Sequence, residues 1–307
     1  MPRARSPRAP PVGGCAGGSP VKPAPFAYVK PASLAEVFRI LAAAGDGARL
    51  LAGGQSLMPS LNLRLSAPEV LVDINGLPGL RGIVLRGDRL RIGALTRHVE
   101  VEHSELVRRH APLIAAAMPH IAHPAIRNRG TFGGSIALAD PAAELPACVL
   151  ALDGEMEIAG SAGTRRVAAG DFFRGLYETA VGAGEVLTAV EVPTQQPDWR
   201  STFAELARRH GDYAMAGIAA QGWIDGDRAR ALRLVFFGVG LQPMRAVQTE
   251  TVLTGQRITR DIVGAAQAAL GQDLQPVGDI QAGGATKLHL ARVLLARALA
   301  SLARQDP

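Results

Sequence analysis

Two glycine-rich segments of the chain have the composition of loops that bind phosphate. The first is AGGQSL at residues 52–57, and the second is RGTFGGS at residues 129–135. Glycine lets the backbone adopt positive φ and approach a ligand closely, and successive N–H groups of such a loop converge on an anion. Ser56, Thr131 and Ser135 would add hydroxyl hydrogen bonds. Together, two such loops could hold the diphosphate of a dinucleotide from both sides.

The glycine pattern alone does not decide between a phosphate site and an ordinary turn. The chain has 35 glycines, so adjacent pairs are common, and either segment taken singly is more often a turn. Neither segment fits the P-loop or the G-x-G-x-x-G pattern, and residues 238–240 (GVG) lack the third glycine of the latter. The residues alone lead to candidate phosphate-binding loops on an α/β domain and no further.

Cysteine and histidine offer no second chemistry. Cys15 and Cys148 are too few for an iron–sulfur cluster, which needs about four thiolates, and too few for a disulfide framework. His120 and His123 form a His-x-x-His pair, but no third ligand stands nearby, so we expect no metal site in this chain. We also assign no catalytic residue.

The basic charge of the chain is concentrated at its N-terminus. The chain has 33 Lys+Arg and 27 Asp+Glu, a net charge of +6, and the first thirty residues hold five of the cations and no acidic residue. The rest is nearly neutral, which argues against nucleic acid as a partner. Residues 1–24 are rich in Pro, Gly and Arg and predict a disordered basic tail without a secretory signal. No stretch is apolar enough to span a membrane, and we expect a cytoplasmic protein.

The elements around the first loop follow from local signals. Residues 33–36 (SLAE) form a capping box that predicts a helix over 33–44. A short buried strand at Ala48–Leu51 would lead into the loop, and a helix at Gln55–Leu65 would follow it. Further expected elements are strands at 69–74, 82–85, 89–92, 155–159, 165–168 and 185–192, and helices at 96–103, 104–118 and 142–152.

The second loop lies in a long irregular stretch, His120–Pro141, dense in Gly, Asn, Arg and Pro. Loops of that length inside a domain are usually functional. A junction at 194–200 separates residues 25–200 from a second α+β unit at 201–307. That unit is expected to contain three antiparallel strands (201–207, 215–224 and 231–239) and three helices (244–253, 259–270 and 285–303).

The order and content of these segments resemble the FAD-binding medium subunit of the molybdenum hydroxylases, the carbon monoxide dehydrogenase and xanthine dehydrogenase group. The resemblance is carried by "AGGQS", "LVDINGL", "RNRGTFGGS", "ADPAAELP" and "ARRHGDYAMAGIA" in this order, and it extends from Phe26 to Leu299. It implies an α+β fold with a two-lobed FAD-binding domain of the vanillyl-alcohol-oxidase (PCMH) type at 25–200, followed by a small C-terminal domain of the CO dehydrogenase flavoprotein kind.

The resemblance also implies the cofactor contacts. The first loop would bind the diphosphate and ribityl regions of FAD and the second loop the diphosphate, while a leucine of a neighbouring strand approaches the ring and a tyrosine shields it. Carried over position by position, these contacts are Lys30, Ala52, Gly53, Gly54, Gln55, Ser56, Leu57, Thr131, Gly133, Gly134, Ser135, Asp140, Glu144, Leu187 and Tyr213.

Some of these residues also have ordinary structural explanations. Asp140 could cap a helix, Glu144 could be a first-turn carboxylate, and Tyr213 taken alone could be a half-buried aromatic at a strand end. Leu138 stands where many relatives carry histidine, which removes a polar group there.

As the resemblance implies, the chain binds FAD while separate subunits carry the other cofactors. Electrons from a molybdenum cofactor on a large subunit would pass through [2Fe–2S] clusters on a small subunit to FAD, and then to an external acceptor. A dimer of heterotrimers is the expected assembly. The alternative is a self-contained FAD-dependent oxidase or dehydrogenase that acts directly on a small molecule.

Overall fold

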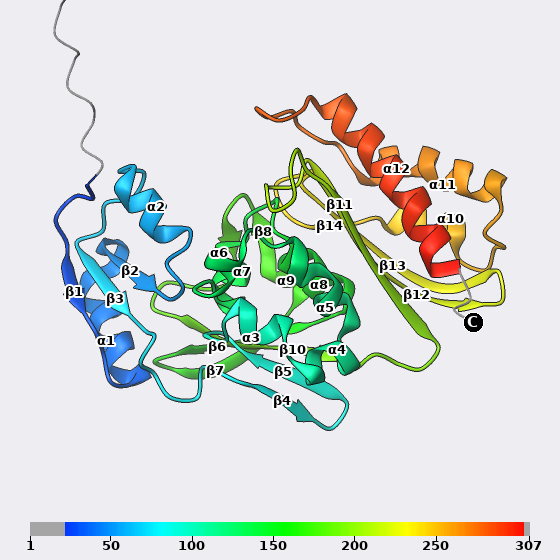
Figure 1. Cartoon of the computed structure of the whole chain (residues 1–307). Coiled ribbons are helices and arrows are strands. Elements are labelled where there is room, and N and C mark those ends of the chain that lie inside the picture. The colour runs from blue at the N-terminus through cyan, green and yellow to red at the C-terminus, as the bar shows by residue number, and fades with distance from the viewer. Residues whose placement is uncertain (1–21, 304–307) are drawn as a thin grey trace, which may run out of the picture.

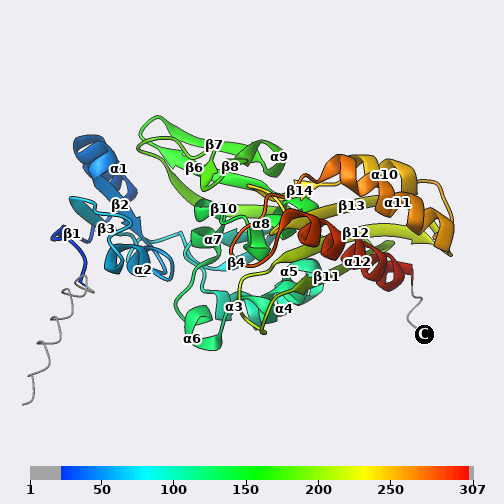
Figure 2. The ribbon, with the colours of Figure 1, turned by 90° about the horizontal axis from the view of Figure 1, so that it is seen from above.

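The computed structural model describes residues 22–303, which form an N-terminal lobe, a central lobe and a C-terminal domain (Figure 1). The predicted basic tail, residues 1–24, lies almost wholly outside the described residues. Figure 2 shows the N-terminal lobe at one end of the molecule and the C-terminal helices at the other, with the central lobe between them.

The N-terminal lobe is a small parallel sheet covered by helices. Its strands, in the order β1-β3-β2, are β1 (Ala27–Val29), β3 (Val70–Asp73) and β2 (Ala48–Leu51), and its helices are α1 (Leu34–Ala44), the short 3₁₀ turn η1 (Gly45–Gly47) and α2 (Leu57–Asn62). The predicted N-cap is present, since Ser33 Oγ accepts from the N–H of Glu36. The Glu36 carboxylate accepts from the N–H of Ala32, one residue before the cap, so the reciprocal bond of a capping box is replaced by a bond to the preceding residue. A hydrophobic core of its own, which includes the buried Val37 and Val72, stabilises the lobe.

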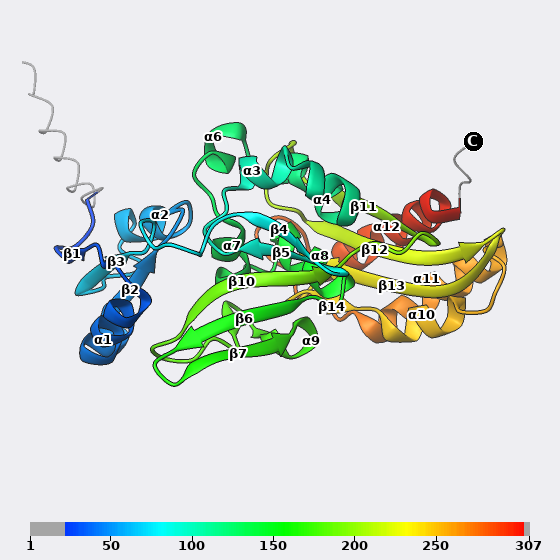
Figure 3. The ribbon, with the colours of Figure 1, turned by 90° about the horizontal axis from the view of Figure 1, so that it is seen from below.

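The central lobe is built on a five-stranded antiparallel sheet. The strands, in the order β4-β5-β10-β6-β7, are β4 (Ile83–Arg86), β5 (Arg89–Gly93), β10 (Val186–Pro193), β6 (Glu155–Gly160) and β7 (Gly163–Ala168). The middle strand β10 is buried from Val186 to Val192, as expected for a strand covered on both faces. Figure 3 shows this sheet beside the C-terminal sheet.

Short helices pack on the central sheet. They are α3 (His98–Glu102), α4 (Glu105–His110), α5 (Pro112–Ala117), the 3₁₀ turn η2 (Met118–His120), α6 (Pro124–Arg127), α7 (Phe132–Leu138), α8 (Glu144–Ala151) and α9 (Ala169–Phe172), and α9 leads into the small hairpin β8 (Phe173–Gly175) and β9 (Glu178–Thr179). The expectation of an irregular stretch at His120–Pro141 was wrong in part, because α6 and α7 lie within it. Helix α7 contains Gly133 and Gly134, which are poor helix formers, so its local sequence gave little sign of a helix.

The C-terminal domain is an antiparallel sheet with a core on each face. Strands β11 (Trp199–Leu206), β12 (Ala216–Asp225), β13 (Arg228–Phe237) and β14 (Met244–Arg245) follow each other in the sheet. Ile218 of β12 packs toward α10 (Val247–Leu253), α11 (Arg260–Asp273) and α12 (Gly284–Ala303), whereas its neighbour Ala219 joins the core of the central lobe. Successive side chains of a strand point to opposite faces of the sheet, so one face of this sheet packs on its own helices and the other packs on the central lobe.

The prediction of three strands in the C-terminal domain was wrong, because the sheet has four. The fourth strand, β14, occupies the first two residues of the helix expected at 244–253, and helix α10 begins only at Val247. Met244 and Arg245 pair with the end of β13, and a two-residue strand has no periodicity that a sequence pattern can reveal. Among the described residues, no helix is long and apolar enough to cross a membrane.

Candidate cofactor site

A cavity of about 710 Å³ lies where the N-terminal lobe meets the central lobe, and the loop between β11 and β12 closes one side. Cavities of this size bind small molecules and cofactors. Fourteen of the fifteen predicted contacts line it: Ala52, Gly53, Gly54, Gln55, Ser56, Leu57, Thr131, Gly133, Gly134, Ser135, Asp140, Glu144, Leu187 and Tyr213.

The two glycine loops touch each other backbone to backbone at this cavity. A Cβ atom placed on Gly53 would stand 2.6 Å from the carbonyl oxygen of Arg129 and 2.9 Å from Cα of Gly130. Real Cβ atoms do not approach backbone this closely, so only glycine fits at position 53. Gly54 has a positive φ of 72°, which turns the chain from β2 toward α2.

The first loop presents unused hydrogen-bond donors to the cavity. Within residues 22–303, the backbone N–H groups of residues 53–56 donate to no protein acceptor, and the Ser56 hydroxyl has no hydrogen-bond partner. Residues 53–55 are half-buried, while Ser56 is exposed. Backbone donors away from water are nearly always satisfied in folded proteins. This row of free donors fits an anionic ligand group such as a diphosphate.

The second loop differs from the first, because its N–H groups donate inward. Phe132 donates to Thr96 O, Gly133 donates to Ala94 O, and the N–H of Gly134 donates to the Thr131 hydroxyl at the start of α7. The second loop is thus held firmly to the central lobe and offers the cavity side chains, chiefly the Ser135 hydroxyl, rather than a cluster of amides.

Two polar side chains that the sequence did not single out hold the loops together. Asn75, just after β3, donates through Nδ2 to the carbonyl oxygen of Ala52 over 2.8 Å. Arg97, just before α3, donates to the carbonyl oxygen of Arg129 and, over 2.7 Å, to Oδ1 of Asn75. The sequence shows Asn75 only as part of a turn, and no local signal reveals that Arg97 reaches across to the other lobe.

His98 is a second residue that sequence reasoning did not find. It lines the cavity wall but is 6% exposed, and its Nε2 lies 3.0 Å from the carbonyl oxygen of Thr131. Burial lowers the pKa of His98 to about 4, so the ring is neutral at pH 7. Its Nδ1 atom packs against Gly130, where a Cβ would stand 2.9 Å away.

The cavity wall also carries two carboxyl groups and a tyrosine. Glu144 is buried, and its burial, followed by the nearby charges of Glu205 and Asp140, raises its pKa to about 8. Asp140 accepts from the N–H of Ala142, but α8 is capped by residue 143, so Asp140 is not the helix cap that its position suggested. Tyr213 is 60% exposed at the mouth.

Family comparisons match both parts of the chain. Residues 24–195 match the model of the FAD binding domain in molybdopterin dehydrogenase, and residues 201–302 match that of the CO dehydrogenase flavoprotein C-terminal domain. The chain belongs to this flavoprotein family. The mixed helix-and-strand fold with an FAD-binding domain followed by a C-terminal domain is therefore confirmed.

Similar proteins cover nearly the whole flavoprotein. The 6-hydroxypseudooxynicotine dehydrogenase complex subunit alpha of Paenarthrobacter nicotinovorans is 39% identical over 91% of this chain and 95% of its own length. The carbon monoxide dehydrogenase medium chain of Hydrogenophaga pseudoflava is 35% identical over 90% and 96%. Among solved structures, carbon monoxide dehydrogenase from H. pseudoflava lacking the Mo-pyranopterin moiety aligns with a TM-score of 0.89 at 36% identity, over 91% of this chain and 98% of that one. Quinoline 2-oxidoreductase from Pseudomonas putida 86 aligns with a TM-score of 0.87 at 38% identity, over 92% and 98%.

Lys30 is the predicted contact that the flavoprotein does not place on the cavity wall. Its Cε lies 3.1 Å from where a Cβ on Gly76 would stand. Burial acts to raise the pKa of Asp73, but hydrogen bonds from Tyr28 and Asn75, with a smaller contribution from the charge of Lys30, lower it overall. Asp73 accepts from the Tyr28 hydroxyl over 2.5 Å and from the N–H of Asn75. Lys30 therefore lies on the N-terminal lobe beside the residues that hold Asn75.

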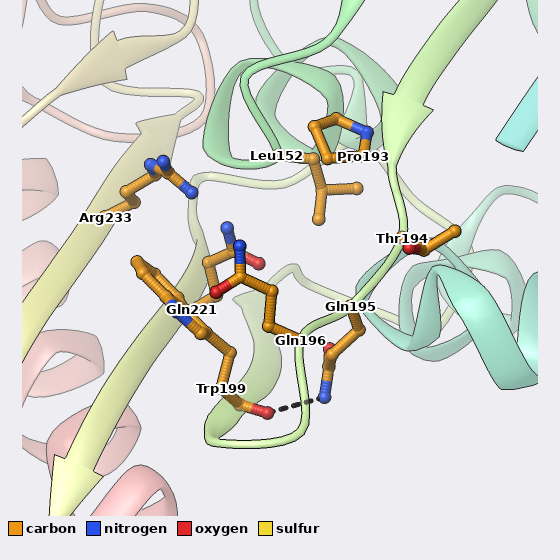
Figure 4. Close-up of a pocket in the computed structure, with 8 residues that line it drawn as sticks. All are labelled: Leu152, Pro193, Thr194, Gln195, Gln196, Trp199, Gln221 and Arg233. Carbon is orange, nitrogen blue, oxygen red and sulfur yellow. Dashed lines mark hydrogen bonds between the residues drawn. The ribbon is translucent and has the colours of Figure 1, made fainter. Parts of the chain in front are cut away.

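A second pocket of the flavoprotein, about 120 Å³, lies between the central lobe and the C-terminal domain (Figure 4). Gln195 donates to the carbonyl oxygen of Trp199 over 2.7 Å, and the Arg233 guanidinium lies 4.8 Å from the Trp199 ring centre. Arg233 also pairs with Asp153 at 2.5 Å. The pocket is smaller than ordinary ligand sites, and these contacts join the two parts of the chain.

Proposed function

We propose that this flavoprotein binds FAD in the cavity between its glycine loops. The chain is the FAD-binding subunit of a multi-subunit molybdenum hydroxylase, as its family membership states, and it passes electrons from iron–sulfur clusters on a partner to an external acceptor. The observation that carries the location is the row of free N–H groups at residues 53–56, which faces the second loop across one cavity.

Some residues of the cavity would bind FAD, and others would shield it from water. The N–H groups of residues 53–56 bind the diphosphate, and the hydroxyls of Ser56 and Ser135 orient the adjoining groups. Tyr213 covers the mouth and excludes water, while Glu144 keeps a proton on its carboxyl group. FAD, when bound, takes up electrons one at a time and releases one or two, which is chemistry that no side chain supplies.

The remaining parts of the proposal concern fold detail, assembly and location. The two lobes and the shared cavity support the two-lobed PCMH type of FAD-binding domain. The relatives' names as medium chains and complex subunits support partner subunits of other sizes, for which we propose a small iron–sulfur and a large molybdenum subunit. A dimer of heterotrimers in the cytoplasm is the assembly that we propose. Native mass measurement of the complex, purified with its partner subunits, tests the assembly.

Titration of the purified chain with FAD, followed by flavin fluorescence, tests the location. Gly54→Ala and Gly79→Ala form a matched pair, because both positions have positive φ, 72° and 77°, but only Gly54 lines the cavity. Both substitutions place a side chain at positive φ, and the Cβ at Gly54 additionally meets the side chains of Leu51 and Met58 at 3.2 Å, which can shift. Only Gly54→Ala should weaken FAD binding, by about tenfold or more. Equal FAD affinity in the two variants would contradict the proposed position. A chain that takes up no FAD even with its partners would contradict the function itself.

A further inference from the structure

Strand β10 contains an extra residue at the point where it reaches the cavity. From Ala189 onward its pairing with β5 is regular, but its pairing with β6 shifts between Leu187 and Ala189. Leu187 lies opposite Ile158 and Ala189 lies opposite Glu157, so Thr188 has no partner on β6. Such an inserted residue is a β-bulge, which redirects a neighbouring side chain and is common beside functional sites.

The bulge decides which way Leu187 faces. Val190 and Val192 lie in the core of the central lobe, whereas Glu191 between them forms ion pairs on the face of the sheet opposite that core. Regular alternation would place Thr188 in the core and Leu187 on the opposite face. Leu187 instead belongs to the same core as Val190 and lines the cavity. The extra residue therefore puts a leucine on the cavity wall where a regular strand would put a threonine.

The side chain of Thr188 is held on the face opposite the core. Glu157 lies between the core residues Met156 and Ile158, so its carboxylate is on that face. Oγ1 of Thr188, which is 4% exposed, lies 2.7 Å from Oε1 of Glu157 and 3.0 Å from its carbonyl oxygen. The same Oε1 accepts from Nη2 of Arg91 over 2.8 Å. These contacts fix the bulge without using any atom of the cavity wall.

The charge state of Glu157 suits this arrangement. Burial acts to raise its pKa, but hydrogen bonds from Arg91 and Thr188 lower it overall, so the group is a carboxylate at neutral pH. A charged acceptor makes a stronger hydrogen bond with a hydroxyl than a neutral acceptor does.

The backbone of Thr188 has a separate connection to the cavity. Its carbonyl oxygen accepts from the N–H of Ala94 over 2.9 Å, and the carbonyl oxygen of Ala94 accepts from the N–H of Gly133 in the second glycine loop. This connection uses main-chain atoms alone. A substitution that changes only the side chain of residue 188 therefore affects the position of Leu187 and spares the support of the loop.

We propose that Thr188, held by Glu157 and Arg91, is a positioning residue that locks Leu187 onto the wall of the cofactor cavity. The proposal rests on the proposed function, in which FAD fills this cavity and, as the family resemblance implies, its flavin ring lies near Leu187. Without the lock, the end of β10 is free to return to regular alternation, which withdraws the leucine from the wall. Loss of the Thr188 hydroxyl should therefore weaken binding of the flavin end of FAD and spare its ADP half.

Titration of the full-length chain with FAD and with ADP separates the two ends of the cofactor. Thr188→Val keeps the branched shape of the side chain and removes the hydroxyl, whereas Thr188→Ser keeps the hydroxyl. Thr188→Val should raise the Kd for FAD about tenfold and leave the Kd for ADP within about twofold of the wild type. Thr188→Ser should bind both ligands as the wild type does. Leu187→Ala should reproduce the pattern of Thr188→Val.

Thr202→Val is the matched control for loss of a strand hydroxyl. Thr202 lies in β11 outside the cavity wall, and its Oγ1 is 3.2 Å from Oγ of Ser301. Both Kd values should be unchanged in this variant. Glu157→Gln provides a second test if Thr188→Val does not fold. Its neutral amide oxygen accepts a weaker hydrogen bond, so the Kd for FAD should rise roughly threefold, again with little change for ADP.

Two results would overturn the positioning role of Thr188. One is wild-type FAD affinity in both Thr188→Val and Glu157→Gln, because the lock would then have no influence on the cavity. The other is an equal loss of FAD and ADP affinity, because a general structural defect affects both halves of the site. A wild-type chain that binds neither ligand, even with its partners, would instead contradict the proposed function.

Discussion

Arg97 and Asn75 are joined across the two lobes, with the guanidinium Nη2 of Arg97 2.7 Å from Oδ1 of Asn75. Each residue also bonds the backbone of a glycine loop, Asn75 at Ala52 and Arg97 at Arg129. The separation of the two loops is therefore set by side chains that do not line the cavity themselves.

Removal of this link should weaken cofactor binding without unfolding either lobe. Arg97→Ala loses charge-assisted hydrogen bonds to the second loop and to Asn75, which are each worth about 1.5–3 kcal/mol, so the Kd for FAD should rise roughly 10- to 100-fold. Fluorescence titration measures the change, with Arg109→Ala on the exposed face of α4 as the control. A Kd within twofold of the wild type for Arg97→Ala would show that the loops hold their spacing without the link.

Gly53 should not tolerate even one methyl group. The Cβ of Gly53→Ala would collide with the backbone of residues 129–130, which cannot rotate away, so we expect a loss of about 1–3 kcal/mol of stability together with weaker FAD binding. Gly264→Ala in α11 is the matched control, because its Cβ meets nothing within 4 Å. That variant should gain about 0.5–1 kcal/mol in urea unfolding. Equal stability of the two variants would be incompatible with the loop contact.

His98 should make the cofactor-free chain sensitive to acid. Its pKa in the folded chain is about 4, below the ordinary 6.5. Between these two pH values the unfolded chain therefore binds a proton that the folded chain does not bind. The stabilisation is complete above pH 6.5 and is lost as the pH falls to about 4, on the order of 3 kcal/mol in total. Urea unfolding at pH 7 and pH 4.5 measures it, and His98→Gln should remove most of the difference.

Glu144 should act in the opposite direction. Its folded pKa of about 8 lies above the ordinary 4.5, so its contribution to stability is complete below pH 4.5 and is lost as the pH rises through 8. Glu144→Gln should therefore stabilise the cofactor-free chain at pH 8.5 by a few kcal/mol and have little effect at pH 4.5. If the variant is no more stable than the wild type at pH 8.5, the carboxyl group is not held neutral by its surroundings.

Local signals predicted the elements whose residues decide their own conformation. The Ser33 cap and its apolar repeat predicted 33–44, and α1 covers Leu34–Ala44. Helix α7 was not predicted, because Gly133 packs on Ala94, a contact between distant residues that local propensity cannot show. Strand β14 was missed for the same reason, since only its pairing with β13 defines it.

The sequence led to the cavity-lining residues but not to those that hold them. The glycine loops have a recognisable composition, whereas Asn75 and Arg97 are ordinary polar residues whose partners lie on another lobe. The second loop also departs from a simple amide cluster, because the N–H of Gly133 is already used by Ala94 O. Which donors remain free depends on tertiary packing, which spacing along the chain does not encode.

The division of the cavity between two lobes, each with its own hydrophobic core, has a consequence for maturation of the subunit. A ligand that touches both loops binds only the closed arrangement, so binding and lobe docking are thermodynamically linked. At a free FAD concentration 100 times the Kd, this linkage adds about 2.7 kcal/mol to the docked state. The cofactor-free chain should thus melt in separate steps, beginning with the N-terminal lobe, whereas the loaded chain melts as a single cooperative unit.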